Sequence, residues 1–248
     1  MFRYILFYNL RTHLFRGIAL VYSPTLMISM RTLRKKPNSI SAQNRVLEGE
    51  DAPSWTAPPS LKSGTRAEVF RTIYTENVWG SGSGGGSSIE ETREYREFLQ
   101  DFLRRNHVKS VLDVGCGDWQ FSRLIDWSGI NYVGVDIVPS LVQLNIQRYG
   151  AKNIRFLKLD AVEDELPIAD LVIIKDVLQH LSTPAALQLL AKLNGYRFQL
   201  FVNDYAKTNR DCDDGDTRPI NLNAPPFNLN AKEIMKIRMK RVMLLCNK

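Results

Sequence analysis

Glycines and acids gather just after three apolar runs of this 248-residue sequence. The first run leads into a turn with two glycines between acids, and the next two runs end in an acid: Asp113, Gly115, Gly117, Asp118, Asp136 and Asp160. Glycines let backbone N–H groups approach a polar ligand closely, and a carboxylate can accept hydrogen bonds from two hydroxyls. A helix cap explains any single acid, but the repetition favours a nucleoside-containing cofactor.

A fourth apolar run ends in Lys175-Asp176, and His180 follows four residues after Asp176. A helical turn there would place Asp176 and His180 on one face. If the reaction activates a hydroxyl, we expect His180 to be the general base with Asp176 orienting its ring, or Asp176 to be the base itself. The alternative interpretation is a packed or capping histidine.

Apolar runs alternate with stretches of helical periodicity, and this alternation sets the expected fold. We expect strands at 110–114, 132–136, 154–158, 171–175 and 199–203, with helical stretches near 119–128, 139–149 and 184–193. The pattern predicts an α/β fold with a doubly wound, mostly parallel sheet. Ligands of such sheets bind at the carboxyl ends of the strands, where these acids would meet.

The segment SGSGGGSS at 81–88 precedes another predicted helix, which Ser88 and Glu91 would open as a capping box. One interpretation is a flexible linker. The other is a loop whose missing side chains let the backbone approach a ligand, and its place directly before a helix favours this second interpretation.

The turn after the first run distinguishes between cofactors. A dinucleotide site prefers a third glycine where Gln120 stands, and the acids Asp113 and Asp118 disfavour a pyrophosphate. Over about 108–204 the chain instead resembles the class I S-adenosylmethionine-dependent methyltransferases, through four motifs in order: VLDVGCGD, YVGVDIV, FLKLDA and ADLVIIKDVLQHLS. A nucleotide-dependent oxidoreductase is the less favoured alternative.

This resemblance implies a Rossmann-like class I methyltransferase fold with S-adenosylmethionine as cofactor. The aspartate and glycines of the first turn, Asp113, Gly115 and Gly117, would hold the methionine moiety. Asp136 would hold the ribose, and Asp160 with Ala161 the adenine. The other cofactor contacts that we expect are Trp79, Gly80, Asp118, Ile137 and Lys175.

Two further segments, VWGSGSGGGSS and NRDCDDGDTRPINLNAPPFN at 209–228, resemble a branch of small methyltransferases, some of which act on sugar hydroxyls. The resemblance implies O-methylation of a small hydroxyl acceptor, with a sugar or other carbohydrate favoured. A cofactor-binding pseudoenzyme, or a subunit that serves an active partner, is the alternative from a non-enzyme class. The segment VNDY at 202–205 lacks the prolines of base-amino methyltransferases, so we expect no DNA substrate.

The loop 209–218 is dense in acids. It is either a solvated loop or a lid whose carboxylates and Arg218 bind a polyol or a divalent metal. Its spacing does not match a calcium-binding loop, so we predict no metal site. After 228 the sequence has room for a helix and one strand at 241–246, which predicts that the last strand of the sheet is missing. An uncovered edge there would favour a homo-oligomer.

Charge divides the chain into three predicted parts. Residues 1–47 hold eight basic residues and no acid, 48–231 have a net charge of −6, and 232–248 have +5, which together give +7. We predict a basic N-terminal extension at 1–47, either transit-like or an upstream start, a linker and lead-in at 48–77, and a methyltransferase domain at 78–248.

Cellular location is predicted from cysteines and hydropathy. Three widely spaced cysteines indicate a reducing compartment, so we expect a cytoplasmic protein, with organellar targeting by 1–36 as the alternative. The longest uncharged run of the N-terminal extension, 17–30, has 14 residues, too few for a membrane-spanning helix.

Overall fold

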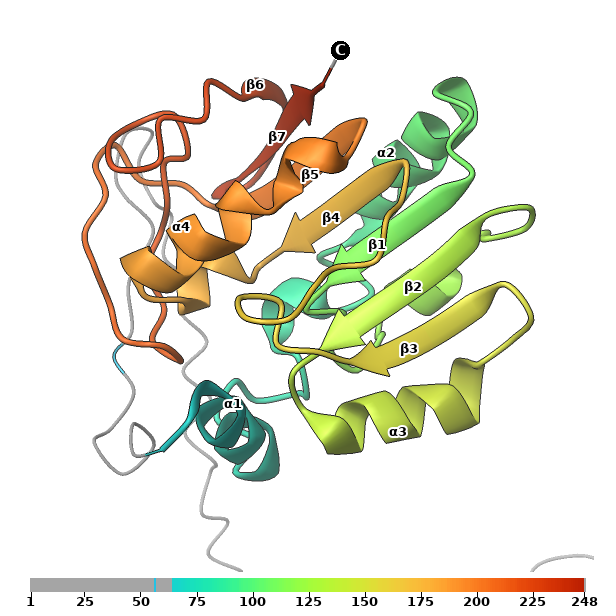
Figure 1. Ribbon diagram of the computed structural model, residues 1–248, viewed down its shortest axis with the longest axis horizontal. Helices are drawn as coiled ribbons and strands as arrows, with labels where there is room; N and C mark the ends of the chain where they lie inside the picture. The colour runs from blue at the N-terminus through green and yellow to red at the C-terminus, as the bar shows by residue number, and fades with distance from the viewer. Residues whose placement is uncertain (1–55, 57–63, 248) are drawn as a thin grey trace, which may run out of the picture. The chain divides into compact units, whose positions relative to one another are not determined.

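The computed structural model describes residue 56 and residues 64–247, so the predicted extension at 1–47 lies outside the described residues. A mixed sheet of seven strands forms the centre, in the order β3-β2-β1-β4-β5-β7-β6 (Figure 1). Its strands are β1 Ser110–Val114, β2 Asn131–Asp136, β3 Ile154–Lys158, β4 Leu171–Lys175, β5 Phe198–Asp204, β6 Lys232–Ile237 and β7 Lys240–Cys246. The five predicted strands are therefore confirmed, and the parallel pairs place their carboxyl ends at one edge.

Helices cover the sheet and cross its carboxyl edge. They are α1 Arg66–Thr75, α2 Arg93–Arg105, α3 Pro139–Tyr149 and α4 Thr183–Ala191. The arrowheads of the parallel strands point toward α1 (Figure 1). Pro139 and Pro184 stand in the first turns of α3 and α4, where a proline loses no helical hydrogen bond. The predicted α/β fold is thus confirmed.

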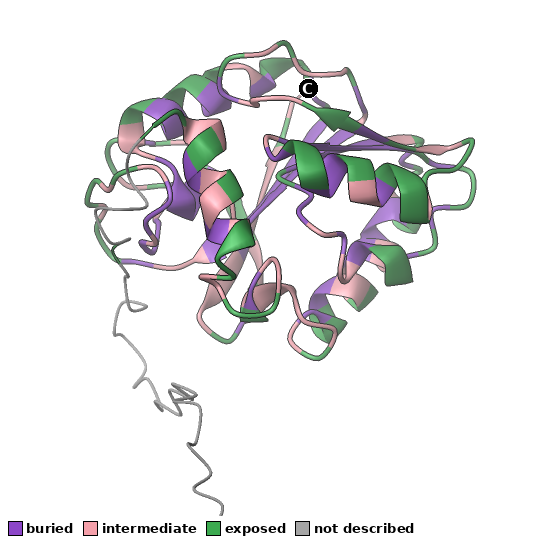
Figure 2. Cartoon of the chain, turned by 90° about the horizontal axis from the view of Figure 1, so that it is seen from below, coloured by how far each residue is buried: buried purple, intermediate pink, exposed green. Residues whose placement is uncertain are grey.

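Two hydrophobic clusters lie on opposite faces of the sheet. One joins α2 to β1 and β2 through residues such as Leu99, Phe102 and Tyr132. The other joins α4 to β4 and β5 through Leu189, Ile174 and Phe201. Buried residues fill the central strands β1, β2, β4 and β5 and the inner sides of the helices (Figure 2), because strands covered on both faces must be apolar throughout.

The C-terminal prediction was right for the strand at 241–246, which is β7, and wrong for the rest. Residues 232–237 form the strand β6 where a helix was expected, so the last strand is not missing. β7 pairs antiparallel with both β5 and β6, so it fills the edge that was expected to be uncovered. Ile237 pairs with Lys240, which leaves Arg238 and Met239 as the turn, and Arg238 has a φ of 53°. Two-residue hairpin turns usually carry Asn or Gly at such positions, so the sequence lacked the usual hairpin signal.

Two helix starts also differ from the prediction. The stretch 119–128 contains only a 3₁₀ turn, Ser122–Leu124. Trp119 has a φ of 56°, which is incompatible with a helix beginning there. Ser88 does accept a hydrogen bond from the Glu91 N–H at 3.2 Å, but α2 begins at Arg93.

The lead-in and the long loop after β5 both belong to the folded body. α1 falls within the predicted linker and lead-in at 48–77, yet its Val69 and Ile73 are buried. Residues 205–231 contain no helix and cover the sheet with Ile220, Leu222 and Phe227. Within the part of the chain that the structure describes, no helix is long and apolar enough to cross a bilayer.

The position of β7 inside the sheet can be tested by stability. Val242 of β7 is fully buried, so Val242→Ala should lower the free energy of unfolding by about 2 kcal/mol. Ile168→Ala is the control, because Ile168 is 94% exposed and its truncation should change stability by less than about 0.5 kcal/mol. Urea denaturation of both variants checks this, and equal effects would contradict the strand assignment.

Candidate active site

Two adjoining cavities open at the carboxyl edge of the parallel strands. The larger cavity, about 620 Å³ with its mouth included, lies between α1 and the ends of β2, β3 and β4. The smaller cavity, about 490 Å³, lies beside the glycine-rich loop and the end of β1. They share Tyr74, Trp79, Gly115, Asp176 and His180. Volumes of this size suit a small organic ligand.

The structure brings most of the predicted residues to these cavities. The larger cavity is lined by Asp136, Ile137, Asp160 and Ala161. The smaller is lined by Asp113, Asp118 and Lys175, and both by Trp79, Gly115, Asp176 and His180. Gly80 and Gly117 line neither: Gly80 is exposed, whereas the Gly117 N–H is used inside the turn.

Asp136 holds the glycine turn together from the end of β2. Its carboxylate accepts hydrogen bonds from the N–H groups of Gly117, at 2.9 Å, and Val138, at 3.0 Å. Burial raises the pKa of Asp136, and these N–H groups act to lower it. A third N–H group, that of Ile137, also acts on this carboxylate. Because a carboxylate has about four acceptor positions, acceptor capacity remains for a ligand in the larger cavity.

The turn at 115–117 is shaped so that only glycine fits. Gly115 has a φ of 68°, and a Cβ there would lie 2.4 Å from Val177 Cγ2. Gly117 has a φ of 56°, and its Cβ would lie 2.3 Å from Ser83 Oγ. Both backbone positions favour glycine, and of the two only Gly115 lines the cavities.

Asp113 forms the deepest acidic group of the smaller cavity. It is 6% exposed and accepts a hydrogen bond of 2.6 Å from the Tyr132 hydroxyl. Burial raises the pKa of Asp113 to about 6, although Tyr132 and nearby Lys175 act to lower it.

The glycine-rich loop covers the smaller cavity and is fixed at two points. Ser83 Oγ donates to Asp118 Oδ1 at 2.8 Å and accepts from the Asp118 N–H at 3.0 Å. Further along, the carbonyl of Gly86 accepts from Lys175 Nζ at 2.9 Å. The loop is therefore a wall of the cavity, held by side chains that follow β1 and β4.

Asp176 is locked between two ammonium groups. Its oxygens accept from Lys175 Nζ and Lys240 Nζ, each at 2.6 Å, and Lys240 also reaches Asp204 at 3.1 Å. Burial would raise the pKa of Asp176, but the two lysines outweigh it and hold this pKa well below its usual range. Nothing in the sequence indicated Lys240, because this residue reaches Asp176 only through the unpredicted hairpin of β6 and β7.

His180 ends the 3₁₀ turn Leu178–His180, and its ring is held by groups other than Asp176. Nδ1 lies 2.9 Å from the Asp216 carbonyl, and Nε2 lies 3.5 Å from the Gln179 amide nitrogen. The carbonyl can only accept and the amide nitrogen can only donate, so Nδ1 carries the proton and Nε2 is unprotonated. The prediction that Asp176 orients the ring was wrong, because the Asp216 carbonyl does so.

The environment of His180 keeps the ring neutral and flat against the cavity. Burial lowers the pKa of His180 below 6.5, although the Asp216 carbonyl acts to raise it. The Gln179 amide is itself fixed, since its oxygen accepts from the Asp204 N–H at 3.0 Å. Trp79 packs on the imidazole with ring centres 4.8 Å apart.

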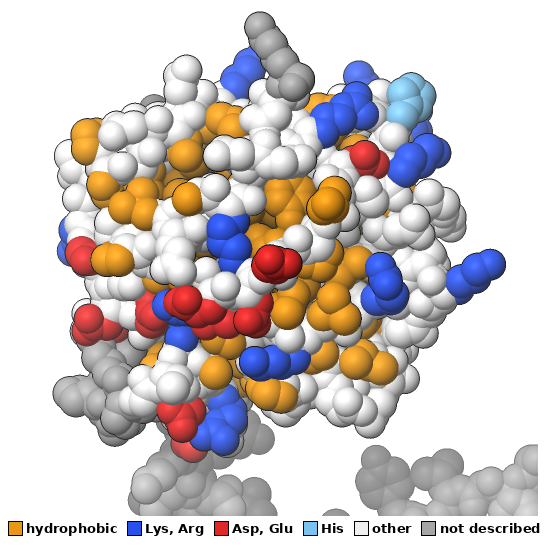
Figure 3. All heavy atoms as spheres, viewed as in Figure 1, with side chains coloured by type: hydrophobic (Ala, Val, Ile, Leu, Met, Phe, Trp, Pro, Cys, Tyr) orange, Lys and Arg blue, Asp and Glu red, His pale blue; other side chains and the backbone are white. Residues whose placement is uncertain are grey.

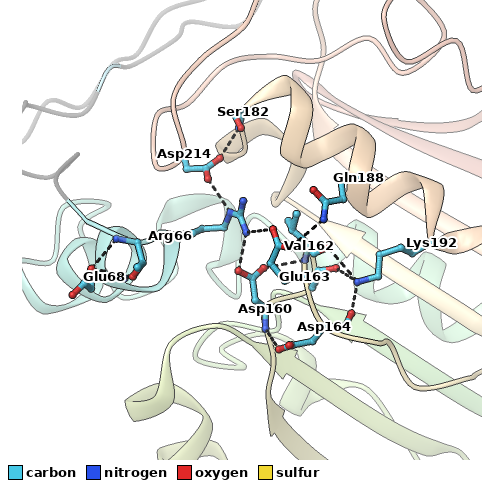
Figure 4. Close-up of polar contacts among 12 residues, drawn as sticks. Arg66, Glu68, Asp160, Val162, Glu163, Asp164, Ser182, Gln188, Lys192 and Asp214 are labelled. Carbon is cyan, nitrogen blue, oxygen red and sulfur yellow. Dashed lines mark hydrogen bonds and ion pairs between the residues drawn. The ribbon is translucent and has the colours of Figure 1, made fainter.

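α1 closes the larger cavity, a role that the sequence did not indicate. Arg66, Phe70 and Tyr74 line that cavity from this helix. The Arg66 guanidinium donates to Asp160 at 2.7 Å and to Asp214 at 2.8 Å, bridging the end of β3 and the acidic loop (Figure 4). Acidic side chains gather on this face of the domain with basic groups among them (Figure 3). The two ion pairs of Arg66 therefore connect α1 to the end of β3 and to the acidic loop.

The acidic loop 209–218 packs on α4, and its Arg218 does not face a ligand. Arg218 is 1% exposed and donates to the carbonyls of Leu181, at 2.7 Å, and Arg210, at 2.8 Å. Asp211 and Asp214 accept from the first N–H groups of α4, those of Thr183 and Ser182. The interpretation of Arg218 and these acids as a polyol-binding lid was thus wrong. Within the described ranges, no group of three His, Cys, Asp or Glu side chains is placed to hold a metal.

Comparisons with known proteins agree with this architecture. Residues 89–210 match a family model described as a methyltransferase domain. No curated protein sequence matches the chain.

Three solved structures share the fold at low identity. Magnesium protoporphyrin IX methyltransferase from Synechocystis, solved with bound S-adenosylmethionine, is 15% identical over 75% of this chain and 99% of its own, with a TM-score of 0.51. The 1,6-didemethyltoxoflavin N1-methyltransferase of Burkholderia thailandensis, solved with S-adenosylhomocysteine, is 18% identical over 79% and 92%, with a TM-score of 0.51. A Nostoc punctiforme protein provisionally assigned as an O-methyltransferase is 13% identical over 63%, with a TM-score of 0.50, and the chain spans only 56% of its length.

The matched segment, the strand order and the cavities at the carboxyl edge together define the class. Residues 89–210 match a methyltransferase domain, and the described body has the Rossmann-like fold of class I methyltransferases.

The contribution of the Arg66 ion pairs to the stability of α1 can be tested without any ligand. Arg66 is 17% exposed and pairs with two carboxylates, so Arg66→Met should speed amide hydrogen exchange in α1 by about ten- to a hundredfold. Arg71→Met is the control, because Arg71 is exposed on the same helix. Exchange rates that are equal in the two variants would mean that the ion pairs do not hold α1 in place.

Proposed function

We propose that this chain transfers a methyl group from S-adenosylmethionine to a hydroxyl of a small polar acceptor, with a sugar favoured. The observation that carries the proposal is the state of His180. Its ring lines both cavities with Nδ1 protonated, and Nε2 is an unprotonated acceptor whose contact with the Gln179 amide nitrogen is long, at 3.5 Å. A hydroxyl acceptor requires such a base, because an alcohol must lose its proton as the new bond forms.

The larger cavity fits the adenosine part of the cofactor. Asp136 keeps acceptor capacity for the ribose hydroxyls beside its bonds to backbone N–H groups. Apolar surface for the adenine ring comes from Ile137, Ala161 and Val177. Asp160 is the proposed acceptor for the adenine amine, with one oxygen already shared with Arg66.

The smaller cavity fits the methionine part. Lys175 supplies a cation for the carboxylate, and Asp113 and Asp118 supply acids for the ammonium group. Gly115 lines both cavities, and its bare α-carbon leaves room for the chain that joins the two parts. The positions of these side chains in the smaller cavity therefore support the roles that the motif resemblance implies.

In this proposal the cofactor supplies an activated methyl group, and the protein aligns the acceptor and removes its proton. His180 Nε2 takes the proton, and the Asp216 carbonyl stabilises the imidazolium that results. Asp176 is a poor base, because its two lysine partners keep it ionised with a low proton affinity. Asp176 acts instead by fixing Lys175 and Lys240.

The cofactor assignment is tested by calorimetric titration of the full chain. S-adenosylmethionine should bind saturably and NAD should not. Asp136→Ala should weaken binding about a hundredfold or more, because two charge-assisted hydrogen bonds to ribose are lost. Asp126→Ala, at an exposed site, is the control. Binding of NAD alone would support the oxidoreductase alternative instead.

The base is tested by rates and their pH dependence, after a labelled-methyl screen over sugars and other small alcohols. His180→Gln should lower kcat about 10²- to 10⁴-fold while cofactor affinity stays near that of the unaltered protein. His107→Gln, at an exposed histidine, should change nothing.

The sign of the pH effect follows from the lowered pKa of His180. Protonation removes the base, so kcat/KM should fall below a pKa that is under 6.5 and level off by neutral pH. His180→Gln should lose this acid limb. A limb that persists in His180→Gln would assign the base to another group. Cofactor binding without transfer to any acceptor would favour the pseudoenzyme alternative.

A further inference from the structure

The residue before His180 contacts the ring nitrogen that is proposed to take the proton. Gln179 is 4% exposed and belongs to the 3₁₀ turn Leu178–His180. Its side-chain nitrogen lies 3.5 Å from His180 Nε2, and no other group of the described residues lies within hydrogen-bond distance of that atom. Thr217 Oγ1, at 3.1 Å, and the Asp216 carbonyl, at 2.9 Å, lie at Nδ1 instead. The polar surroundings of Nε2 on the protein side are therefore set by Gln179.

Asp204 fixes the orientation of the Gln179 amide at both of its ends. The Asp204 backbone N–H donates to Gln179 Oε1 at 3.0 Å, and Asp204 Oδ2 accepts from Gln179 Nε2 at 3.4 Å. An amide turned by half a circle would set its oxygen against the carboxylate and its N–H groups against the backbone N–H, which would leave both ends without a partner. The N–H end of the amide therefore faces His180.

Asp204 is itself part of the buried ion-pair network. Its Oδ1 accepts from Lys240 Nζ at 3.1 Å, and Lys240 also donates to Asp176 at 2.6 Å. The Gln179 amide is thus connected to the charged groups that hold the wall of the smaller cavity, and its orientation persists as long as that network does.

This orientation disfavours a proton on His180 Nε2. Such a proton would point at N–H groups, which cannot accept it, whereas an unprotonated Nε2 can accept from them. At 3.5 Å the contact is long and weak, so a substrate hydroxyl can replace it at little cost. The amide therefore acts against the imidazolium while the lone pair of Nε2 stays available to a substrate.

Charged groups from three other elements also face the ring. Burial has the largest effect and lowers the pKa of His180, and Lys240 of β7 lowers it further. The Asp216 carbonyl of the acidic loop acts to raise this pKa, as do the carboxylates of Asp176 after β4 and Asp204 of β5. Two carboxylates thus favour the imidazolium, and the amide opposes them at the one atom where the proton would be added.

We propose that Gln179 is a positioning residue of His180, which holds Nε2 unprotonated at neutral pH by presenting to it an amide N–H that cannot accept a proton. Its part in catalysis rests on the proposed methyl transfer, but the proton state of the ring is a property of the protein alone. The amide keeps the base ready and also limits its strength, since a group that disfavours the imidazolium lowers the proton affinity of the ring.

The test is an NMR titration of the histidine ring signals of the full chain against pH, without any ligand. The signal of His180 is identified by its absence in His180→Gln. Gln179→Glu places a carboxylate oxygen at Nε2, which can accept from the added proton, so the pKa of His180 should rise by about one pH unit or more. Gln147→Glu is the matched control, because Gln147 is exposed on α3 and the same substitution there should leave this pKa unchanged.

A second variant keeps the test independent of whether a new carboxylate is tolerated close to Asp204. Gln179→Ala opens a polar space beside the Asp204 N–H, the Asp204 carboxylate and His180 Nε2, and a water with these three partners can fill it. Because a water can accept from a protonated Nε2, the pKa of His180 should rise in this variant as well, though by less. A pKa of His180 that is unchanged or lower in the folded variants would overturn the proposal.

Rate measurements separate this inference from the proposed function. With a methylated acceptor, the acid limb of kcat/KM should move to higher pH in Gln179→Glu by the same amount as the NMR titration, and Gln147→Glu should not move it. A limb that stays in place while the NMR pKa rises would overturn the part of Gln179 in catalysis. If no acceptor is methylated, the proposed function fails, whereas a raised NMR pKa still supports the control of His180 by Gln179.

Discussion

The buried carboxylate of Asp176 is the interaction on which the rest of the site depends. It joins Lys175 at the end of β4 to Lys240 at the start of β7, and Lys175 also holds the glycine-rich loop through Gly86. Three segments far apart in the sequence thus meet at one charge. A buried charge is tolerated only when it is fully paired, and removing one partner strands the others. The network therefore fixes the hairpin, the loop and the wall of the smaller cavity together.

This arrangement also separates the roles of the two polar residues after β4. The same lysines that make Asp176 an anchor deprive it of basicity, because they stabilise its ionised form. His180 has the opposite environment: burial disfavours its charged form, and a carbonyl fixes its tautomer. Neighbouring residues of one motif are thus divided into a structural anion and a neutral group suited to accept a proton, and the division arises from their partners.

Short-range features of the site could be predicted from the sequence, and long-range ones could not. The first three parallel strands each carry an acid at or near their carboxyl end, so the sequence pattern alone suffices to place Asp113, Asp136 and Asp160 at one edge. Arg66 and Lys240 reach the same edge from residues 94 positions before Asp160 and 64 positions after Asp176. Their contacts depend on how α1 and the C-terminal hairpin pack, and the turn of that hairpin lacks the glycine or asparagine that would have revealed it.

The residues around the two cavities come partly from the segment that matches the family model and partly from the chain before and after it. The segment that matches the family model, 89–210, contains the strand ends assigned to the cofactor. Tyr74 and Trp79, which line both cavities, precede that segment, as does the glycine-rich loop that covers the smaller cavity. Lys240 and the Asp216 carbonyl that orients His180 follow it. A fold that serves many acceptors can keep its cofactor edge constant and change only such flanking parts. If the proposed methyl transfer holds, we expect the residues that select the acceptor to lie in α1, the glycine-rich loop and the chain after β5.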